Sequence, residues 1–342
     1  MSATPRLSVV FATYNRAALA KRLVQQLGAQ SLPPESFEIV VVDDGSATDV
    51  AALLRSLDVP CPLQALTQAN QGAAAARHHA VSVARGDIVV TVDDDMEIGQ
   101  DFLAAHLKLH EGGPRRVVLG HIRPAAQLAT MPIFERYHAE MLDRFVDGIE
   151  SGTTALRGND VCTGNVSFRR ADYHAVGGFD LTLGRSEDAD LGLRLERSGC
   201  HLVFSREAYT IHGSDHTSLG VWMSRAYRYG IFDLRIARKY PDIPWASPWR
   251  FFRLVHPLSR VPLGLAVASP AVGRLLARAA IMTAMAIDKL GAERLAVAGT
   301  TLAYGLLYFA GVRHEAGPLR AAVADYRANA RTDDTERPGA SS

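Results

Sequence analysis

The chain has 342 residues, enough for one large domain or two smaller ones. Hydrophobic residues make up 48% and charged residues 21%, which is typical of a globular protein and excludes a largely disordered chain. The formal net charge of +1 gives no sign of nucleic-acid binding. Three widely spaced cysteines argue against a disulfide framework and a zinc site, and they favour a reducing compartment.

The N-terminal segment leads directly into a short apolar run, Leu7–Phe11. A signal peptide needs a basic start, a longer apolar core and a small-residue cleavage site, so we interpret this run as a first strand. We therefore expect the catalytic part in the cytoplasm, with any membrane contact peripheral, on the inner face of the cell membrane.

Patterns typical of buried strands and of helices alternate over the first part of the chain. We predict strands at Leu7–Ala12, Phe37–Val42, Leu63–Leu66 and Ile88–Val92. We predict helices at Ala17–Gln30, Thr48–Leu57 and Gly72–Ala84. Repeated strand–helix–strand units imply parallel pairing with right-handed crossovers, so the sequence predicts an α/β fold with an open sheet.

The second part is less regular. We predict strands at Val117–Ile122 and Val166–Arg169 and a short strand that ends at His212. Helices are predicted at Pro132–Gly148, Glu187–Ser198 and Thr217–Tyr240. The segment Ser151–Asp160 is rich in Gly, Thr and Asn and is predicted to be a mobile loop, and the polar end, Asn329–Ser342, to be disordered.

The C-terminal segment is basic and apolar. Between Trp249 and Arg320, nine Lys and Arg residues stand against three acidic ones. Two arginines interrupt the apolar stretch Val261–Ile287, and Leu295–Val312 is only moderately hydrophobic, so the pattern favours helices that lie on an anionic membrane surface through residues 249–320. Packing against the enzyme domain is the alternative. We thus expect a domain over 1–240, a helical segment over 241–328 and a tail over 329–342.

Polar clusters follow three of the predicted strands, where ligands bind in open α/β sheets. They are Thr13-Tyr14-Asn15, Asp43-Asp44-Gly45-Ser46 and Asp93-Asp94-Asp95. Three adjacent carboxylates repel one another unless a cation neutralises them, and hard oxygen ligands suit Mg²⁺ or Mn²⁺ bound to a diphosphate. The alternative for each acidic cluster is a solvated turn or a helix cap.

Other side chains have both a functional and a structural interpretation. Tyr14 can stack on a base or pack at the strand end, and Arg77 can bind a phosphate or pair with an aspartate. Glu187 and Asp188 begin a helix, where the helix dipole favours acidic residues, but a carboxylate there can also act as a general base. His212 can complete a metal site or be structural, and His216 is a competing candidate.

In order along the chain, these motifs resemble the inverting family 2 glycosyltransferases of GT-A fold, a Rossmann-like open mixed sheet flanked by helices. The resemblance covers roughly residues 7–240. It rests on Thr13-Tyr14-Asn15-Arg16, Asp43-Asp44-Gly45-Ser46, Asn70-Gln71-Gly72, Ala76-Arg77, Arg85-Gly86-Asp87, Asp93-Asp94-Asp95, Gly164-Asn165, Gly177-Gly178-Phe179-Asp180 and Glu187-Asp188-Ala189-Asp190-Leu191. The ordered set is far more specific than any one motif.

The resemblance implies a role for each matching residue. Ala12 and Tyr14 would border the nucleobase, Asp44 would bond its edge, Arg77 would lie beside it and Asp93 near the ribose. Asp95 and His212 would hold Mg²⁺ or Mn²⁺, Asp188 would be the catalytic base, and Gly164 and Asn165 would line the sugar pocket. Asp94 and Glu187 join the donor-binding set without a narrower role.

The sequence also departs from the family pattern. His78 stands where asparagine is common after the arginine, and the Gln-x-x-Arg-Trp motif of processive synthases is absent around Trp222. We therefore expect one sugar per encounter, transferred from a nucleotide-sugar to a saccharide or lipid-linked acceptor, with nucleic acid excluded as a partner. The alternatives are a sugar nucleotidyltransferase, although a Gly-rich basic phosphate loop is missing from Asn15–Ala20, and a non-catalytic sugar- or lipid-binding module.

Overall fold

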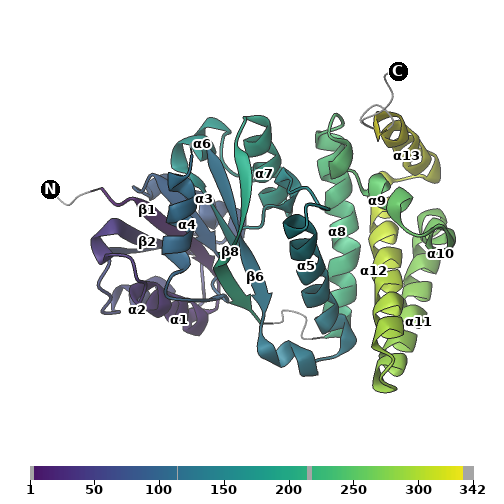
Figure 1. Ribbon diagram of the computed structural model, residues 1–342, viewed down its shortest axis with the longest axis horizontal. Coiled ribbons are helices and arrows are strands. Elements are labelled where there is room, and N and C mark those ends of the chain that lie inside the picture. Colours follow the sequence, from purple (N-terminus) through teal and green to yellow (C-terminus); the bar gives the residue numbers. More distant parts are fainter. Residues whose placement is uncertain (1–3, 114, 214–217, 334–342) are drawn as a thin grey trace. The chain divides into compact units, whose positions relative to one another are not determined.

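The computed structural model describes residues 4–113, 115–213 and 218–333. The chain forms two compact units (Figure 1). The first consists of Met1–Ala125 and Leu142–Gly213, and the second of Ala126–Met141 and Ser214–Ser342. The predicted division at residue 240 differs from this arrangement, because helix α8 (Leu219–Lys239) belongs to the second unit.

An eight-stranded mixed sheet forms the centre of the first unit, with the order β3-β2-β1-β4-β7-β6-β8-β5. The strands are β1 Leu7–Thr13, β2 Phe37–Asp43, β3 Leu63–Thr67, β4 Ile88–Val92, β5 Glu97–Ile98, β6 Arg116–Pro124, β7 Asn165–Arg169 and β8 His201–His212. Strands β1 to β4 are parallel, whereas β7 runs antiparallel to both β4 and β6. The predicted open α/β sheet is confirmed, and its second half is mixed.

Helices flank this sheet. Those of the first unit are α1 Ala17–Gly28, α2 Val50–Arg55, α3 Ala73–Val83, α4 Phe102–Glu111, the second half of α5 Ile133–Glu150, α6 Arg170–Ala175 and α7 Glu187–Arg197, with the short 3-10 helices η1 Pro34–Ser36 and η3 Gly158–Asp160. The sequence did not predict α4, α6 or the two-residue β5. The segment predicted as a mobile loop contains η3, where Gly158 packs against α7: a Cβ on it would lie 2.6 Å from the Leu193 nitrogen.

Alternate residues of the central strands face two separate hydrophobic cores, which is why these strands read as continuous apolar runs. On one face, Val9, Phe11 and Ile39 pack with Leu23 and Leu27 of α1. On the other face, the core contains Val10, Val40, Val42, Ala76 and Ala80. The sheet and its helices therefore hold the carboxyl ends of β1, β2 and β4 in fixed register.

The second half of the sheet is joined by a buried polar network. The two ring nitrogens of His106 lie 2.8 Å from Ser167 Oγ and 3.0 Å from Asn165 Oδ1, and Asn165 Nδ2 donates to the Ala208 carbonyl at 2.9 Å. Burial lowers the pKa of His106 to about 4 and that of its neighbour His110 to about 3. Both imidazoles are therefore neutral in the folded protein near neutral pH.

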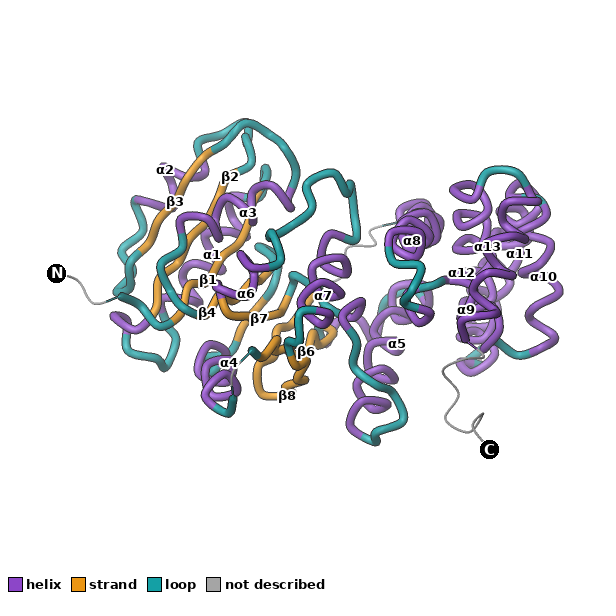
Figure 2. The backbone as a smooth tube through the Cα atoms, turned by 90° about the horizontal axis from the view of Figure 1, so that it is seen from above, coloured by secondary structure: helices purple, strands orange, loops and turns teal. Residues whose placement is uncertain are grey.

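The second unit is built from helices alone in its described part (Figure 2). They are η2 Ala126–Thr130, the first half of α5 Ile133–Glu150, α8, η4 Pro244–Ala246, α9 Pro248–Leu254, α10 Pro257–Ala268, α11 Pro270–Lys289, α12 Glu293–Ala316 and α13 Leu319–Asp333. Helix α13 includes the first residues of the tail predicted to be disordered, and residues 334–342 lie outside the description.

Helices α11 and α12 are long and apolar enough to cross a membrane by length and composition. They differ in their surroundings, because 67% of the apolar window of α12 is buried within the protein but only 22% of that of α11. Helix α12 packs against α8, α10 and α11, as the core helix of a soluble bundle also does. Helices α10 and α11 leave several large apolar side chains exposed, and Leu254 in α9 and Leu295 in α12 are exposed as well.

Two glycines let α8 and α12 touch backbone to backbone. A Cβ on Gly230 would lie 1.9 Å from the Tyr308 carbonyl oxygen, and one on Gly311 would lie 1.9 Å from that of Tyr227. We expect Gly230→Ala to lower the melting temperature in circular dichroism, because separating the helices costs about 1–3 kcal/mol. Gly264→Ala in α10, which meets no atom within 4 Å, is the control and should gain from helix propensity; equal shifts in both variants would contradict the prediction.

Candidate functional site

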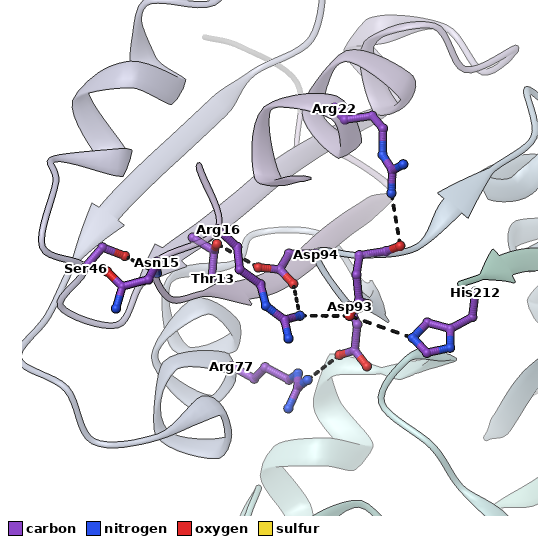
Figure 3. Close-up of polar contacts among 10 residues, drawn as sticks. Thr13, Asn15, Arg16, Arg22, Ser46, Arg77, Asp93, Asp94 and His212 are labelled. Atoms are coloured by element: carbon purple, nitrogen blue, oxygen red, sulfur yellow. Dashed lines mark hydrogen bonds and ion pairs between the residues drawn. The ribbon is translucent and has the colours of Figure 1, made fainter. Parts of the chain in front are cut away.

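The carboxyl ends of β1 and β4 meet at a cluster of charged groups in the first unit (Figure 3). Thr13 Oγ1 donates to Asp94 Oδ2 at 2.8 Å. Arg16 Nη1 lies 3.1 Å from Asp94 Oδ1 and 2.8 Å from Asp95 Oδ2. Arg22 of α1 donates to the backbone carbonyl of Asp95 at 3.1 Å. Arg16 and Arg22 therefore both contact the turn Asp93–Asp95, which we call the aspartate turn.

Arg77 connects the aspartate turn with the start of α7. Its guanidinium pairs closely with Asp93 and lies 3.7 Å from Glu187 Oε1, and only 10% of the side chain is exposed. Burial acts against the charged form, but the carboxylates of Asp93 and Glu187 prevail and raise the pKa of Arg77. Arg77 is thus a fixed cation between two parts of the site that are more than ninety residues apart in sequence.

Asp188 follows at the N-terminus of α7. The residue before Glu187, Ser186, has a left-handed φ of 62°, which turns the chain sharply into the helix. Burial, with the Glu187 charge as a second contribution, raises the pKa of Asp188 to about 6, although its Oδ1 accepts a hydrogen bond of 2.9 Å from the Ala189 amide. A carboxylate with such a pKa can take up a proton near neutral pH.

Asp44, at the end of β2, holds the turn that begins α3. Its carboxylate accepts hydrogen bonds from Gln68 Nε2 at 2.9 Å, from the Gln71 amide at 3.0 Å and from the Gly72 amide at 2.8 Å. Nearby, Tyr14 is 49% exposed and Ala12 is partly buried. The exposed phenol ring and the Asp44 turn both flank the end of β1, where the Asp44 amide donates to the Thr13 carbonyl at 2.9 Å. The base-binding role stays a prediction.

His212 ends β8, and its Nε2 lies 3.8 Å from Asp95 Oδ2 (Figure 3). One carboxylate and one imidazole therefore converge on one point, and both are ligand types that Mn²⁺ accepts. Among the described residues, no three His, Cys, Asp or Glu side chains lie close enough together to bind a metal ion on their own. The pair fits a Mg²⁺ or Mn²⁺ ion that takes its other ligands from a diphosphate and water. His216, the competing candidate, lies outside the described residues.

Gly164 and Asn165 are neighbours in sequence but lie in different environments, one at the aspartate turn and the other in the buried polar network. A Cβ on Gly164 would lie 3.1 Å from Asp93 Oδ2, so a side chain there would crowd the aspartate turn. Asn165 is 2% exposed, and its amide bonds His106 and Ala208 within the buried network. The prediction that Asn165 lines a sugar pocket does not fit this placement, because its side chain joins β7 to α4 and β8.

From the sequence we predicted no role for Arg16 or Arg22. Arg16 belongs to the Thr13–Arg16 motif, but the sequence does not show that it pairs with two carboxylates 78 and 79 residues later. In the structure it is the only described arginine with ion pairs to both Asp94 and Asp95.

Comparison with known proteins agrees with this geometry. The sequence profile named glycosyl transferase family 2 matches residues 8–171. Residues 8–171 belong to glycosyl transferase family 2. The family 2 match ends within the first unit and includes the three polar strand ends, Arg77 and Gly164.

Among curated relatives, the validoxylamine A glucosyltransferase of Streptomyces hygroscopicus subsp. limoneus is 32% identical over 238 residues, covering 61% of this chain and 52% of the relative. The pre-mycofactocin glycosyltransferase of Mycobacterium tuberculosis (strain ATCC 25618 / H37Rv) is 27% identical over 242 residues, covering 69% of this chain and 48% of the relative. The chain thus spans about half the length of these curated relatives.

Two solved structures share the GT-A fold at low identity. The mannosyltransferase PcManGT from Pyrobaculum calidifontis, in complex with GDP-Man and Mn²⁺, has a TM-score of 0.61 at 20% identity and covers 91% of this chain and 88% of its own. S. aureus TarS 1–349, in complex with UDP-GlcNAc, has a TM-score of 0.51 at 14% identity and covers 86% and 90%. The chain therefore has the predicted GT-A fold.

Proposed function

We propose that this family 2 chain transfers a sugar from a nucleotide-sugar to an acceptor hydroxyl, one sugar per encounter, with inversion of the anomeric configuration. The observation that carries the proposal is the position of Asp188, a partly buried carboxylate with a pKa of about 6, directly after Glu187, which Arg77 bridges to Asp93 of the aspartate turn. A single displacement requires a base and a site for the leaving diphosphate in a fixed relative geometry, and the Arg77 bridge would provide that geometry.

The roles of the other residues follow from their positions. Tyr14, Ala12 and Asp44 would border the nucleobase, Asp93 would lie near the ribose, and Glu187 would keep Arg77 in place. Gly164 would leave space for the sugar beside Asp93, since any Cβ there approaches that carboxylate. Asp188 would accept the proton of the attacking hydroxyl, which makes the acceptor oxygen a better nucleophile.

Asp95 and His212 would hold a divalent cation, Mn²⁺ or Mg²⁺. When bound, the cation supplies charge stabilisation for the departing nucleoside diphosphate. Support comes from the convergence of the two side chains, with Asp95 Oδ2 and His212 Nε2 3.8 Å apart, and from their chemical suitability as ligands. The PcManGT structure, which contains GDP-Man and Mn²⁺, supports the same combination of donor and cation.

The experiment that tests the function is turnover by the purified full chain with Mn²⁺, a panel of nucleotide-sugars and a panel of saccharide and lipid-linked acceptors. We expect release of the nucleoside diphosphate together with a glycoside of inverted configuration in proton NMR. Retention of configuration would refute the single displacement. Release of pyrophosphate from a nucleoside triphosphate would indicate a sugar nucleotidyltransferase, and donor binding without turnover would indicate a binding module.

We also propose that the acceptor is reached at the cytoplasmic face of a membrane, through α10 and α11. Support comes from large side chains that the outer faces of these helices expose. Leu258 is 77% exposed, Val261 69%, Leu275 68% and Met282 58%. Among the described residues, Arg278, Lys289 and Arg294 form no ion pair, while Asp288 and Glu293 are both neutralised by Arg136. Exposed apolar groups beside unpaired cations suit an anionic interface.

Vesicle binding checks the membrane proposal. The full chain should co-sediment with phosphatidylglycerol vesicles, and Leu258→Gln with Leu275→Gln should weaken binding at least about tenfold, because each leucine contributes up to about 1.5–3 kcal/mol on burial. Leu181→Gln is the control, since Leu181 is also exposed, at 52%, but lies in the first unit. The proposal would be refuted if the wild type, the double variant and Leu181→Gln all bound the vesicles equally.

A further inference from the structure

Arg16 differs from Arg77 in how far its side chain is exposed to solvent. It is the N-cap residue of α1, and 49% of its side chain is exposed, whereas only 10% of the Arg77 side chain is. Its carboxylate partners are less accessible, with side-chain exposures of 7% for Asp94 and 18% for Asp95. A solvent-exposed cation is thus paired with two carboxylates that are much less exposed.

The atom that Arg16 contacts on Asp95 is the one that a metal ion would need. Arg16 Nη1 lies 2.8 Å from Asp95 Oδ2, and the same oxygen lies 3.8 Å from His212 Nε2 (Figure 3). A divalent cation between Asp95 and His212 would stand within a few ångströms of the guanidinium. Because like charges at such a distance repel, the cation and Arg16 cannot both keep close contact with this oxygen.

We propose that Arg16 is an exchangeable counter-ion, which neutralises Asp94 and Asp95 in the metal-free protein and leaves Asp95 when the divalent cation binds. This inference rests on the proposed metal-dependent function. It gives Asp94 a role that the sequence did not: with Oδ2 bonded to Thr13 and Oδ1 to Arg16, Asp94 is a positioning residue that retains the displaced arginine near the site. The metal-free turn thereby avoids three uncompensated aspartates.

The test measures Mn²⁺ binding to the full chain by electron paramagnetic resonance, without any donor. Arg16→Gln removes the competitor, so it should bind Mn²⁺ more tightly than the wild type, on the order of fivefold. Arg16→Lys keeps a charge but loses the forked geometry, so its affinity should lie between the two. In the absence of divalent cations, Arg16→Gln should also melt at a lower temperature than the wild type, and Mn²⁺ should restore more of its stability.

Lys21→Gln is the matched control. Lys21 is also a cation of α1, but its side chain is exposed and forms no ion pair among the described residues, so its loss should leave Mn²⁺ affinity unchanged. Equal or weaker Mn²⁺ binding by Arg16→Gln would overturn the counter-ion role alone. If no protein bound Mn²⁺, even with UDP or GDP present, the proposed metal dependence would fall as well.

Discussion

Asp188→Asn should lower the rate of sugar transfer by about 10³-fold, with little change in the affinity for the donor. The amide cannot accept a proton from the acceptor hydroxyl, and general-base catalysis contributes roughly 10²–10⁴-fold. The measurement is kcat with a saturating donor and acceptor, together with the donor Kd from calorimetry. Asp101→Asn is the control, because Asp101 is an exposed carboxylate at another helix start, where it makes no side-chain capping bond.

The pH profile gives a second measure of the same group. The pKa of Asp188 is raised to about 6, and a general base acts only in its deprotonated form. Activity should therefore be complete above about pH 7 and should fall about tenfold per unit below pH 6. Asp188→Asn should lose this acidic limb. Normal transfer by the variant, or an acidic limb that remains unchanged in it, would remove Asp188 as the base.

Asp95→Asn is the second change with a large expected effect. It removes the carboxylate that we assign to the cation, so transfer should fall roughly 10³-fold, in line with the several kcal/mol that a metal contributes at a leaving group. Mn²⁺ affinity should fall with it, which electron paramagnetic resonance measures independently of turnover. His212→Ala should have a smaller effect of the same kind, since it removes one of two protein ligands.

Glu97→Gln is the control for Asp95, because Glu97 lies two residues away and pairs with Arg22 instead of facing His212. It should retain Mn²⁺ binding and transfer. If Asp95→Asn bound Mn²⁺ as tightly as the wild type, the cation site would lie elsewhere. Full activity of the wild type in EDTA would contradict the metal dependence itself.

The sheet and the positions of its polar strand ends could be predicted because local signals decide them. Continuous β-branched runs such as Phe37–Asp43 form strands buried on both faces, and the parallel register places Thr13 beside Asp43 at one edge. Helices α1, α3 and α7 follow from periodicity and composition in the same way. In long, regular segments the periodic pattern alone indicates the secondary structure, so tertiary packing seldom changes it.

The rest depended on partners that are distant in sequence. Asn165 follows a glycine in a motif that implied a sugar contact, but its direction is decided by His106, almost sixty residues earlier. The role of Arg16 depends on its ion pairs with Asp94 and Asp95. Helix α8 packs in the second unit, where Gly230 and Gly311 permit close backbone contact with α12. None of these pairings leaves a periodic pattern that a single sequence would reveal.

The interleaved order of the two units limits how the protein can be divided. The chain enters the second unit at Ala126, returns at Leu142 and leaves the first unit again after Gly213. A fragment that ended at Gly213 would retain Ile133, Phe134 and Tyr137, which are 1%, 5% and 5% exposed in the whole protein. It would lose helices α8 and α12, whose side chains pack against these three residues. Such a fragment is expected to aggregate, so a soluble catalytic fragment would require excision of residues 126–141 as well as a C-terminal cut.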